Sequence, residues 1–261
     1  MRQYVNNFLY EIIQNRKAEI QHEKSAFPLK NISAAGRAHP DFFSVFKKTP
    51  YALIGEIKKA SPSKGVLCDD FIPSRIAGEY IACGIDAISV LTEKKYFQGS
   101  VSYLNEISVF SSVPLLCKDF IIDEYQIIDA CSRGAAAVLL IGEILSEQQL
   151  KEYIVLAGKC NLGYITEAHS GQVIEKCLSA GSVCVGINNR DLESFKTNLN
   201  TTAELARLIP SGTLVISESG INTAQDIRFI TDRVKVHGFL IGETLMKSAD
   251  RAAKISELQN A

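Results

Sequence analysis

The stretch that decides the fold is Ala52-Leu-Ile-Gly-Glu-Ile-Lys-Lys-Ala-Ser-Pro-Ser-Lys-Gly65. It starts as an apolar run typical of a β-strand, becomes charged, and is then broken by a proline and a glycine. Because side chains alternate between the two faces of a strand, Ile54, Glu56 and Lys58 share one face. A carboxylate and an ammonium group therefore stand together where the strand meets its loop. Alone, this pattern fits a surface ion pair as well as a functional site.

Seven similar runs follow this stretch. Most are continuously apolar rather than alternating, as expected for parallel strands that are covered on both faces. Together with the first run, they predict strands over residues 52–58, 87–92, 113–118, 137–141, 162–167, 183–188, 213–217 and 238–241.

Helical patterns separate these strands. Three of the expected helices end in a glycine that leads into the next strand, where glycine takes the left-handed conformation that closes a helix: Gly84, Gly134 and Gly181. Apolar residues at three- and four-residue spacing predict helices over residues 73–83, 102–110, 124–133, 147–158, 172–180, 201–209 and 224–232, and a final helix over 245–258.

Strand and helix alternate eight times, which predicts an α/β fold of the closed (β/α)8 TIM barrel type. An open, doubly wound sheet is the competing fold. Such a sheet would normally carry a G-x-G-x-x-G turn after its first strand, and residues 58–65 do not match that pattern. We therefore expect residues 1–261 to form a single barrel domain.

Residues 1–48 precede the repeating pattern. Apolar residues between Phe8 and Ile20 have helical spacing, and a later cluster contains Phe42, Phe43 and Phe46. Such an aromatic cluster needs burial and argues against a disordered tail. We predict an N-terminal helical extension that packs on the barrel.

Composition limits the class of protein. The chain of 261 residues is 46% hydrophobic and 22% charged, with a formal net charge of -1, which is ordinary for a globular protein and argues against nucleic-acid binding. Its longest apolar run, residues 134–142, is too short to span a bilayer, and residues 1–21 lack the pattern of a signal peptide. Seven cysteines without a C-x-x-C pair fit free thiols in a reducing cytoplasm. We expect a cytoplasmic protein without a membrane partner, and no particular protein partner can be predicted.

Polar side chains end five of the eight predicted strands. In a barrel, the carboxyl ends of the strands form the catalytic face. Charges aimed into a core are costly unless they are paired, so five such strand ends predict a functional site. A cluster of carboxylates and lysines can shift each pKa toward neutrality, as acid–base catalysis requires. The residues on the expected inward side of their strands are Glu56, Lys58, Lys118, Glu167, Asn188 and Glu218.

The last two strands end differently, with Ser219–Gly220 and Gly242–Glu243 before a helix. Backbone amides freed by glycine, with a helix N-terminus behind them, make an anion site, and barrels commonly hold phosphate at this position. Either glycine alone would fit a tight turn, but both together favour phosphate.

The sequence gives little sign of a metal or a cofactor. The four histidines are scattered without ligand spacing, and the chain has neither a dinucleotide fingerprint nor a Walker loop. His169 lies two residues beyond Glu167 and is expected to be a loop residue or a partner of that acid. We predict acid–base catalysis with no metal and no cofactor.

Five longer motifs stand out along the chain. They are Gly55-Glu-Ile-Lys-Lys-Ala-Ser-Pro-Ser-Lys-Gly65, Leu115-Leu-Cys-Lys-Asp-Phe-Ile121, Gly186-Ile-Asn-Asn-Arg-Asp-Leu192, Ser217-Glu-Ser-Gly-Ile221 and Leu240-Ile-Gly-Glu-Thr-Leu-Met246. Together they resemble the indole-3-glycerol phosphate synthase family of tryptophan biosynthesis. The resemblance covers nearly the whole chain, including residues 1–48, which the family places over the catalytic face. One departure is Ala168, where the family more often has valine.

The resemblance implies a carboxy-lyase that closes the indole ring of 1-(2-carboxyphenylamino)-1-deoxyribulose 5-phosphate with loss of carbon dioxide and water. It implies that Lys118 donates the proton that polarises the substrate ketone, and that Glu167 acts in the later dehydration. Glu56 and Lys58 would share the remaining proton transfers. Which lysine acts at which step stays open.

The resemblance also implies how the substrate is held. Asn188 and Glu218 hold the ribulose hydroxyls and the region of the anilino nitrogen. Ser61 and Arg190 meet the substrate carboxylate, and Phe120 joins the substrate-binding residues. The phosphate is held through backbone amides of Ser219, Gly220, Gly242 and Glu243.

Two alternatives remain at this point. Another phosphate-binding barrel enzyme, such as phosphoribosylanthranilate isomerase, would share the anion site but would not need the N-terminal extension or Lys118 beside Glu167. A catalytically dead barrel that acts as a scaffold would be expected to lose some of the polar strand ends, and all of them are present.

Overall fold

Eight parallel strands close into a barrel in the computed structural model, which describes residues 7–29, 39–191 and 194–261. The predicted barrel is confirmed, and each observed strand begins and ends within two residues of its predicted bounds. Around the barrel the order is β1-β10-β9-β8-β7-β6-β5-β4. The bounds are β1 Ala52–Ile57, β4 Ala87–Leu91, β5 Leu115–Lys118, β6 Ala137–Ile141, β7 Gly163–Ala168, β8 Cys184–Asn188, β9 Leu214–Glu218 and β10 Gly238–Ile241.

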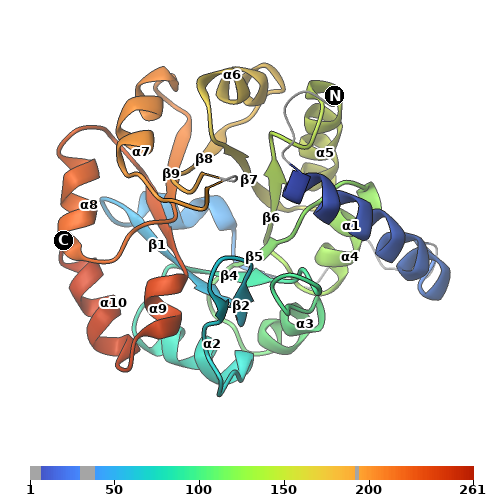
Figure 1. The fold of residues 1–261 in the computed structure, drawn as a ribbon, viewed down its shortest axis with the longest axis horizontal. Coiled ribbons are helices and arrows are strands. Elements are labelled where there is room, and N and C mark those ends of the chain that lie inside the picture. Colours follow the sequence, from blue (N-terminus) through green and yellow to red (C-terminus); the bar gives the residue numbers. More distant parts are fainter. Residues whose placement is uncertain (1–6, 30–38, 192–193) are drawn as a thin grey trace.

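Helices surround the barrel, and Figure 1 shows them as an outer ring. A short antiparallel hairpin, β2 Ala60–Ser61 and β3 Gly65–Val66, follows β1 and was not predicted. The helices are α2 Pro73–Ala82, α3 Ser102–Ser108, α4 Glu124–Ser132, α5 Glu147–Lys159, α6 Gly171–Ser179, α7 Asn200–Leu205 with the 3-10 turn η3 Ala206–Leu208, α8 Ala224–Thr231, α9 Glu243–Lys247 and α10 Arg251–Gln259.

The prediction of one final helix over residues 245–258 is wrong. The chain leaves the helical conformation at Ser248, where the backbone is extended. Asp250 then starts α10 as its N-cap, because its carboxylate accepts a hydrogen bond from the backbone N–H of Ala253. An N-cap carboxylate satisfies an orphan amide at the start of a helix, so it favours a break over a continuous helix.

The three predicted glycine helix ends are confirmed. Gly84, Gly134 and Gly181 have φ values of 75°, 88° and 88°. These left-handed angles are the ones that a side chain would strain, so glycine allows each helix to turn into the following strand.

Buried side chains form two apolar layers. One lies between the strands and the surrounding helices. The other fills the barrel and includes Leu139 and Leu240. It also contains four residues that each lie two positions before a polar strand end and so share its face, which confirms the expected inward side of those strands: Ile54 before Glu56, Leu116 before Lys118, Ile165 before Glu167 and Ile216 before Glu218. Because side chains fill the interior, a ligand site is expected at the carboxyl ends of the strands, as in other barrels of this type.

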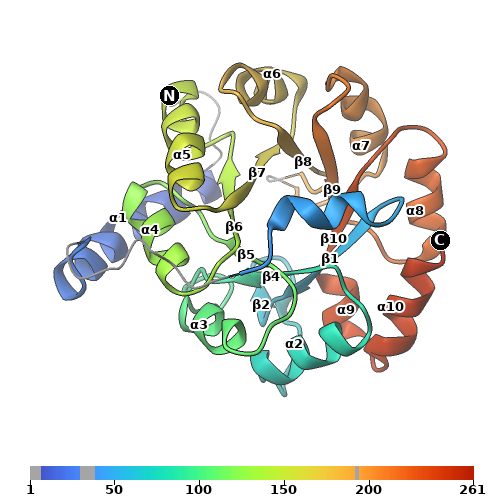
Figure 2. The same cartoon turned by 180° about the vertical axis from the view of Figure 1, so that it is seen from behind.

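The N-terminal segment contributes to both ends of the barrel. Helix α1, Asn7–Ala26, lies across the face seen in Figure 1. The 3-10 helix η2, Phe42–Lys47, lies across the opposite face, which Figure 2 shows. Phe42 and Phe46 pack there against Gly163 and Gly238, the first residues of β7 and β10.

The prediction that residues 1–48 cover the catalytic face is therefore wrong for residues 42–47. Their aromatic rings close the barrel at the ends where the strands begin, because the inner layer needs an apolar cover there. Helix α1 is the part of the extension at the catalytic face, whereas residues 1–6 and 30–38 lie outside the described residues. In the described part of the chain, no helix is long and apolar enough to cross a membrane.

Candidate active site

A cavity of about 780 Å³ opens at the carboxyl ends of the strands. Its walls come from the strand ends, the loops behind them and helix α1. All the residues predicted for the site line it, namely Glu56, Lys58, Ser61, Lys118, Phe120, Glu167, Asn188, Arg190, Glu218, Ser219, Gly220, Gly242 and Glu243. Residues as far apart in the chain as Glu56 and Glu243 thus share one concave surface.

Lys118 lies at the centre of the polar cluster. Its Nζ atom is 3.0 Å from Glu167 Oε2 and 3.1 Å from Glu218 Oε2, so it bridges the ends of β7 and β9. Burial opposes the charge of Lys118, but Glu167, Glu218 and Glu56 outweigh it and raise the pKa of the amine above its usual value. Lys118 is therefore an ammonium ion, and its pKa is shifted away from neutrality rather than toward it as the sequence led us to expect.

The two carboxylates that share Lys118 differ in protonation. Burial raises the pKa of Glu218, and the nearby charge of Glu167 raises it further against the opposing effect of Lys118. Burial also acts to raise the pKa of Glu167, but Lys118 and His169 overcome it and the net shift is downward. At neutral pH the pair therefore favours an ionised Glu167 and a protonated Glu218.

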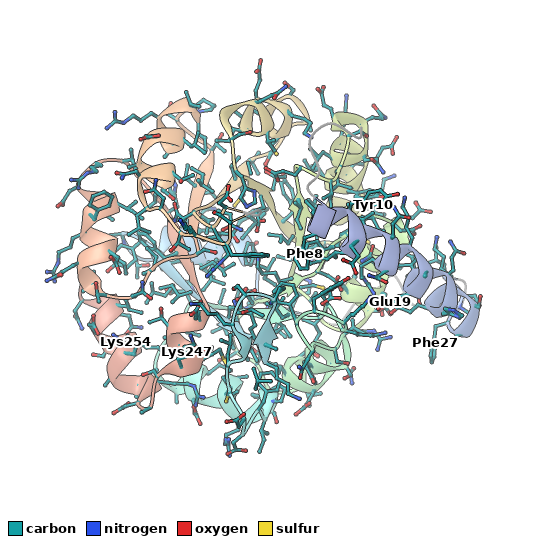
Figure 3. All side chains as sticks on the ribbon, viewed as in Figure 1. Phe8, Tyr10, Glu19, Phe27, Lys247 and Lys254 are labelled. Atoms are coloured by element: carbon teal, nitrogen blue, oxygen red, sulfur yellow. The ribbon has the colours of Figure 1, made fainter. Side chains whose placement is uncertain are left out.

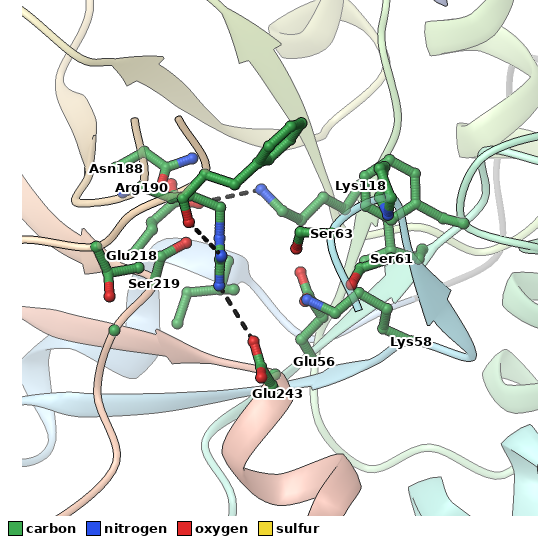
Figure 4. A pocket seen from close by; sticks show the side chains of 18 of the residues that line it. Glu56, Lys58, Ser61, Ser63, Lys118, Asn188, Arg190, Glu218, Ser219 and Glu243 are labelled. Carbon is green, nitrogen blue, oxygen red and sulfur yellow. Dashed lines mark hydrogen bonds and ion pairs between the residues drawn. The ribbon is translucent and has the colours of Figure 1, made fainter. Parts of the chain in front are cut away.

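A second ion pair lies beside this cluster. Lys58 Nζ is 2.5 Å from Glu56 Oε1, and the carboxylate of Glu56 is 2% exposed. Figure 4 shows this pair at the end of β1, on the same side of the cavity as Ser61. The end of β1 and the residue after it therefore place a carboxylate and an ammonium group side by side on the cavity wall.

Two glycines make room for the buried acids. A Cβ atom on Gly186 would lie 2.1 Å from Glu218 Oε1, and one on Gly242 would lie 2.3 Å from Glu56 Oε1. Each acid thus occupies the space of a missing side chain on the neighbouring strand or its loop. The sequence motifs contain both glycines, but only Gly242 was singled out, and for a different reason.

The predicted anion site lies where β9 and β10 end. Ser219 and Gly220 have φ values of 66° and 85°, and Gly242 is the N-cap of α9 without a side-chain cap. A left-handed serine is uncommon, and such strained residues cluster at functional sites. Arg190 donates to Glu243 Oε2 at 3.2 Å, as Figure 4 shows, so it lies at the same end of the cavity.

Helix α1 supplies an apolar wall that strand ends cannot provide. Phe8, Leu9 and Ile12 line the cavity. The ring of Phe8 meets those of Tyr96 and Phe195 edge-on, at centroid distances of 5.3 and 5.6 Å. Figure 3 shows Phe8 at the end of α1 nearest the middle of the barrel. Helical spacing predicted this helix, but not which of its faces meets the cavity.

Buried charge holds α1 to the barrel. Arg16 is 4% exposed, and its Nε atom is 3.2 Å from Asp119 Oδ1. Asp119 directly follows Lys118 and also accepts a hydrogen bond from Thr92 at 2.7 Å. The position of the helix is thus coupled to the end of β5, which carries the central ammonium ion.

The fold and this site define a (β/α)8-barrel enzyme whose acid–base cluster sits at the carboxyl ends of the strands. The family model described as indole-3-glycerol phosphate synthase matches residues 9–258. The chain therefore belongs to the indole-3-glycerol phosphate synthase family. This finding agrees with the resemblance of the five sequence motifs.

Curated relatives carry the same name. The indole-3-glycerol phosphate synthase of Thermoanaerobacter pseudethanolicus is 43% identical over 251 residues, covering 95% of this chain and 96% of that protein. The one from Acetivibrio thermocellus is 38% identical over 257 residues, covering 96% and 98%. The one from Sulfurimonas denitrificans is 39% identical over 258 residues, covering 96% and 98%.

Solved structures add a similarity of fold alone. A 3-hexulose-6-phosphate synthase from Salmonella typhimurium superposes with a TM-score of 0.65 at 10% identity, covering 80% of this chain and 97% of that one. A thiamine phosphate pyrophosphorylase from Pyrococcus furiosus gives 0.60 at 14% identity, covering 81% and 95%.

Proposed function

We propose that this chain is an active indole-3-glycerol phosphate synthase in which Lys118 is the general acid of ring closure. The enzyme is a carboxy-lyase that converts 1-(2-carboxyphenylamino)-1-deoxyribulose 5-phosphate to the indole product, carbon dioxide and water. The observation that carries the assignment is the position of Lys118 Nζ, within 3.1 Å of both Glu167 and Glu218 inside the cavity. The family and its named relatives favour this function over the isomerase and the inactive scaffold.

Ring closure needs a proton donor. As the aromatic carbon that bears the carboxylate attacks the sugar ketone, negative charge develops on the ketone oxygen. An ammonium ion that is held between two carboxylates can give a proton to that oxygen, and a positioned general acid contributes about 10²- to 10⁴-fold in rate. Loss of carbon dioxide then returns the bonding electron pair to the ring and restores its aromaticity.

Dehydration needs both an acid and a base. The hydroxyl group leaves as water after it is protonated, and a base removes a ring proton so that the electron pair of that bond completes the indole double bond. The ionised form of Glu167 suits the base. Glu56 and Lys58 share the remaining proton transfers.

Besides the anion site for the phosphate, the cavity offers three kinds of surface to the rest of the substrate. Asn188 and Glu218 are assigned to the ribulose hydroxyls and the region of the anilino nitrogen. Ser61 and Arg190 are assigned to the carboxylate, and Phe120 with the apolar face of α1 to the aromatic ring. Because Arg190 is also paired with Glu243, it lies between the carboxylate and phosphate sites.

The test is direct conversion. Purified protein is incubated with the carboxyphenylamino-deoxyribulose phosphate, and indole fluorescence and released carbon dioxide are measured. Appearance of both in equal amounts is expected. Conversion of phosphoribosylanthranilate without release of carbon dioxide would instead support the isomerase, and no reaction with either compound would support the scaffold.

Inorganic phosphate is expected to compete with the substrate. The backbone amides after β9 and β10, at Ser219–Gly220 and Gly242–Glu243, form the proposed anion site. Steady-state kinetics should show a raised KM and an unchanged kcat as phosphate is added. A crystal soaked in phosphate should hold the ion at these four residues, and an ion bound only elsewhere would count against the assignment.

Activity is expected to survive exhaustive dialysis against a chelator. Among the described residues, no group of three or more histidine, cysteine, aspartate or glutamate side chains is arranged to hold a metal ion. The measurement is the rate of indole formation before and after dialysis. A rate that falls and is restored by a divalent ion would overturn the proposal of metal-free catalysis.

We also propose a cytoplasmic location. The seven cysteines lack paired spacing, which fits the reduced thiols of that compartment. The net charge of -1 supports a protein that does not bind nucleic acid.

A further inference from the structure

His169 lies between two acids, one of which the proposed mechanism does not use. It directly follows β7, and its Nδ1 atom is 3.1 Å from Oε1 of Glu143. The same oxygen accepts a hydrogen bond from the backbone N–H of His169 at 2.9 Å. On the other side of the ring, Nε2 is 4.0 Å from Oε1 of Glu167. The imidazole thus lies at ion-pair distance from both acids, and Glu143 is anchored beside it by the backbone N–H of His169, although neither ring nitrogen makes a hydrogen bond in the described part of the chain.

The surroundings of this histidine favour its charged form. Burial acts to lower the pKa of His169, but Glu143, Glu167 and Glu218 outweigh burial and raise it. These acids face the ring from the loop after β6, from β7 and from β9. The side chains of His169 and Glu143 are only 15% and 10% exposed, so water screens their interaction weakly.

The charge of His169 distinguishes two otherwise similar carboxylates. Glu167 and Glu218 bind Lys118 at nearly equal distances, 3.0 and 3.1 Å, and both are almost fully buried. Oε1 of Glu167 lies 4.0 Å from Nε2 of His169, whereas the charge that acts on Glu218 besides that of Lys118 is the negative charge of Glu167 itself. Glu167 therefore has two cations nearby and Glu218 has one, which it shares.

We propose that His169, paired with Glu143, determines which of the two carboxylates on Lys118 keeps a proton. The imidazolium stabilises the charge of Glu167, so the shared proton resides on Glu218. The position of the proton does not depend on the proposed function. Its catalytic importance does, since an ionised Glu167 is the base assigned to dehydration. His169 is a positioning residue in this scheme, because it acts through Glu167.

The direct test measures which of the two carboxyl groups carries the proton. Protein labelled with ¹³C at the glutamate side-chain carboxyl group is titrated by NMR, and the two resonances are assigned from Glu167→Gln and Glu218→Gln. In the parent at neutral pH, Glu167 should have the shift of a carboxylate and Glu218 that of a carboxylic acid. In His169→Gln, the pKa of Glu167 should rise by about 1–3 pH units, the effect of losing an opposite charge at this distance.

Kinetics supply the second measurement. In His169→Gln, the acidic limb of the kcat profile should move to higher pH, because the group that must be ionised now binds its proton more tightly, while KM stays near the parent value. Glu143→Gln should shift the profile in the same direction by a smaller amount, since the ring stays but its charge is less favoured. His22→Gln, an exposed histidine of α1, is the matched control and should leave both measurements unchanged.

Identical carboxyl titrations in His169→Gln and the parent would overturn the proposal. An equal loss of activity at every pH, without a shift of the limb, would also overturn it and would show that His169 only packs. If His169→Gln does not fold, Glu143→Gln carries the same test. The NMR titration measures the protonation of Glu167 and Glu218 and needs no catalytic activity. An absence of synthase activity would therefore refute the proposed function, whereas the titration alone decides this inference.

Discussion

Replacing Lys118 with alanine is expected to lower kcat by about 10²- to 10⁴-fold while the barrel stays folded. The substitution removes the proposed proton donor for the ketone oxygen, and this range is typical for a positioned general acid. The measurement is indole formation at saturating substrate. Lys151→Ala, at an exposed position of α5, is the matched control and should keep the parent rate.

The same variant should change how stability depends on pH. Without Lys118, burial and mutual repulsion should raise the pKa of Glu167 in the folded state above its value in the unfolded chain. The folded state then binds protons more tightly than the unfolded state, so stability falls as the pH rises through neutrality. The unfolding temperatures of the variant and the parent between pH 5 and 8 should diverge toward high pH.

For the kinetic prediction, a kcat of Lys118→Ala within twofold of the parent would refute the assignment of Lys118 as the general acid.

Two truncations are expected to separate the two roles of the N-terminal segment. A chain that begins at His39 loses α1 but keeps η2, so it should fold, and its KM should rise by at least about tenfold, equivalent to about 1.4 kcal/mol. The missing surface is the apolar wall of Phe8, Leu9 and Ile12. Removal of α1 also exposes Asp119, whose charge water can then solvate.

A chain that begins at Thr49 should be severely destabilised. It lacks Phe42 and Phe46, which are 1% and 6% exposed and cover the base of the barrel. Removing one buried phenylalanine side chain typically costs about 3–5 kcal/mol, a large part of the stability of a whole protein. Thermal unfolding of both truncations and of Phe42→Ala tests this division. Equal stability of the two truncations would show that η2 is dispensable, and an unchanged KM in the first would show that α1 only packs.

The barrel was predictable because the same signals recur along the chain. Continuous apolar runs mark strands that are covered on both faces, and a glycine before a strand marks where a helix ends. Polar residues such as Lys118 and Glu218 stand out because they end such runs. These signals identify the strands and helices one at a time. The known topology of the (β/α)8 barrel then gives the order of the strands and brings their carboxyl ends together.

Contacts between distant segments were not predictable in the same way. The aromatic cluster that includes Phe42 indicated burial, but composition does not say which end of the barrel needs a cover. Glu143 follows an apolar strand end, and only the fold brings its carboxylate to the ring of His169. The break before Asp250 was missed because one capping hydrogen bond outweighed a helical pattern that continues on both sides.

The glycines that face the buried acids limit how this barrel can be redesigned. Gly186 and Glu218 occupy one shared volume across β8 and β9, and Gly242 and Glu56 occupy another across β10 and β1. The two residues of each pair must be changed together, since a larger residue at the glycine requires a shorter acid opposite it. A library that varies one strand at a time samples only half of each unit. Adapting the pocket to a different sugar phosphate therefore requires simultaneous substitutions on adjacent strands.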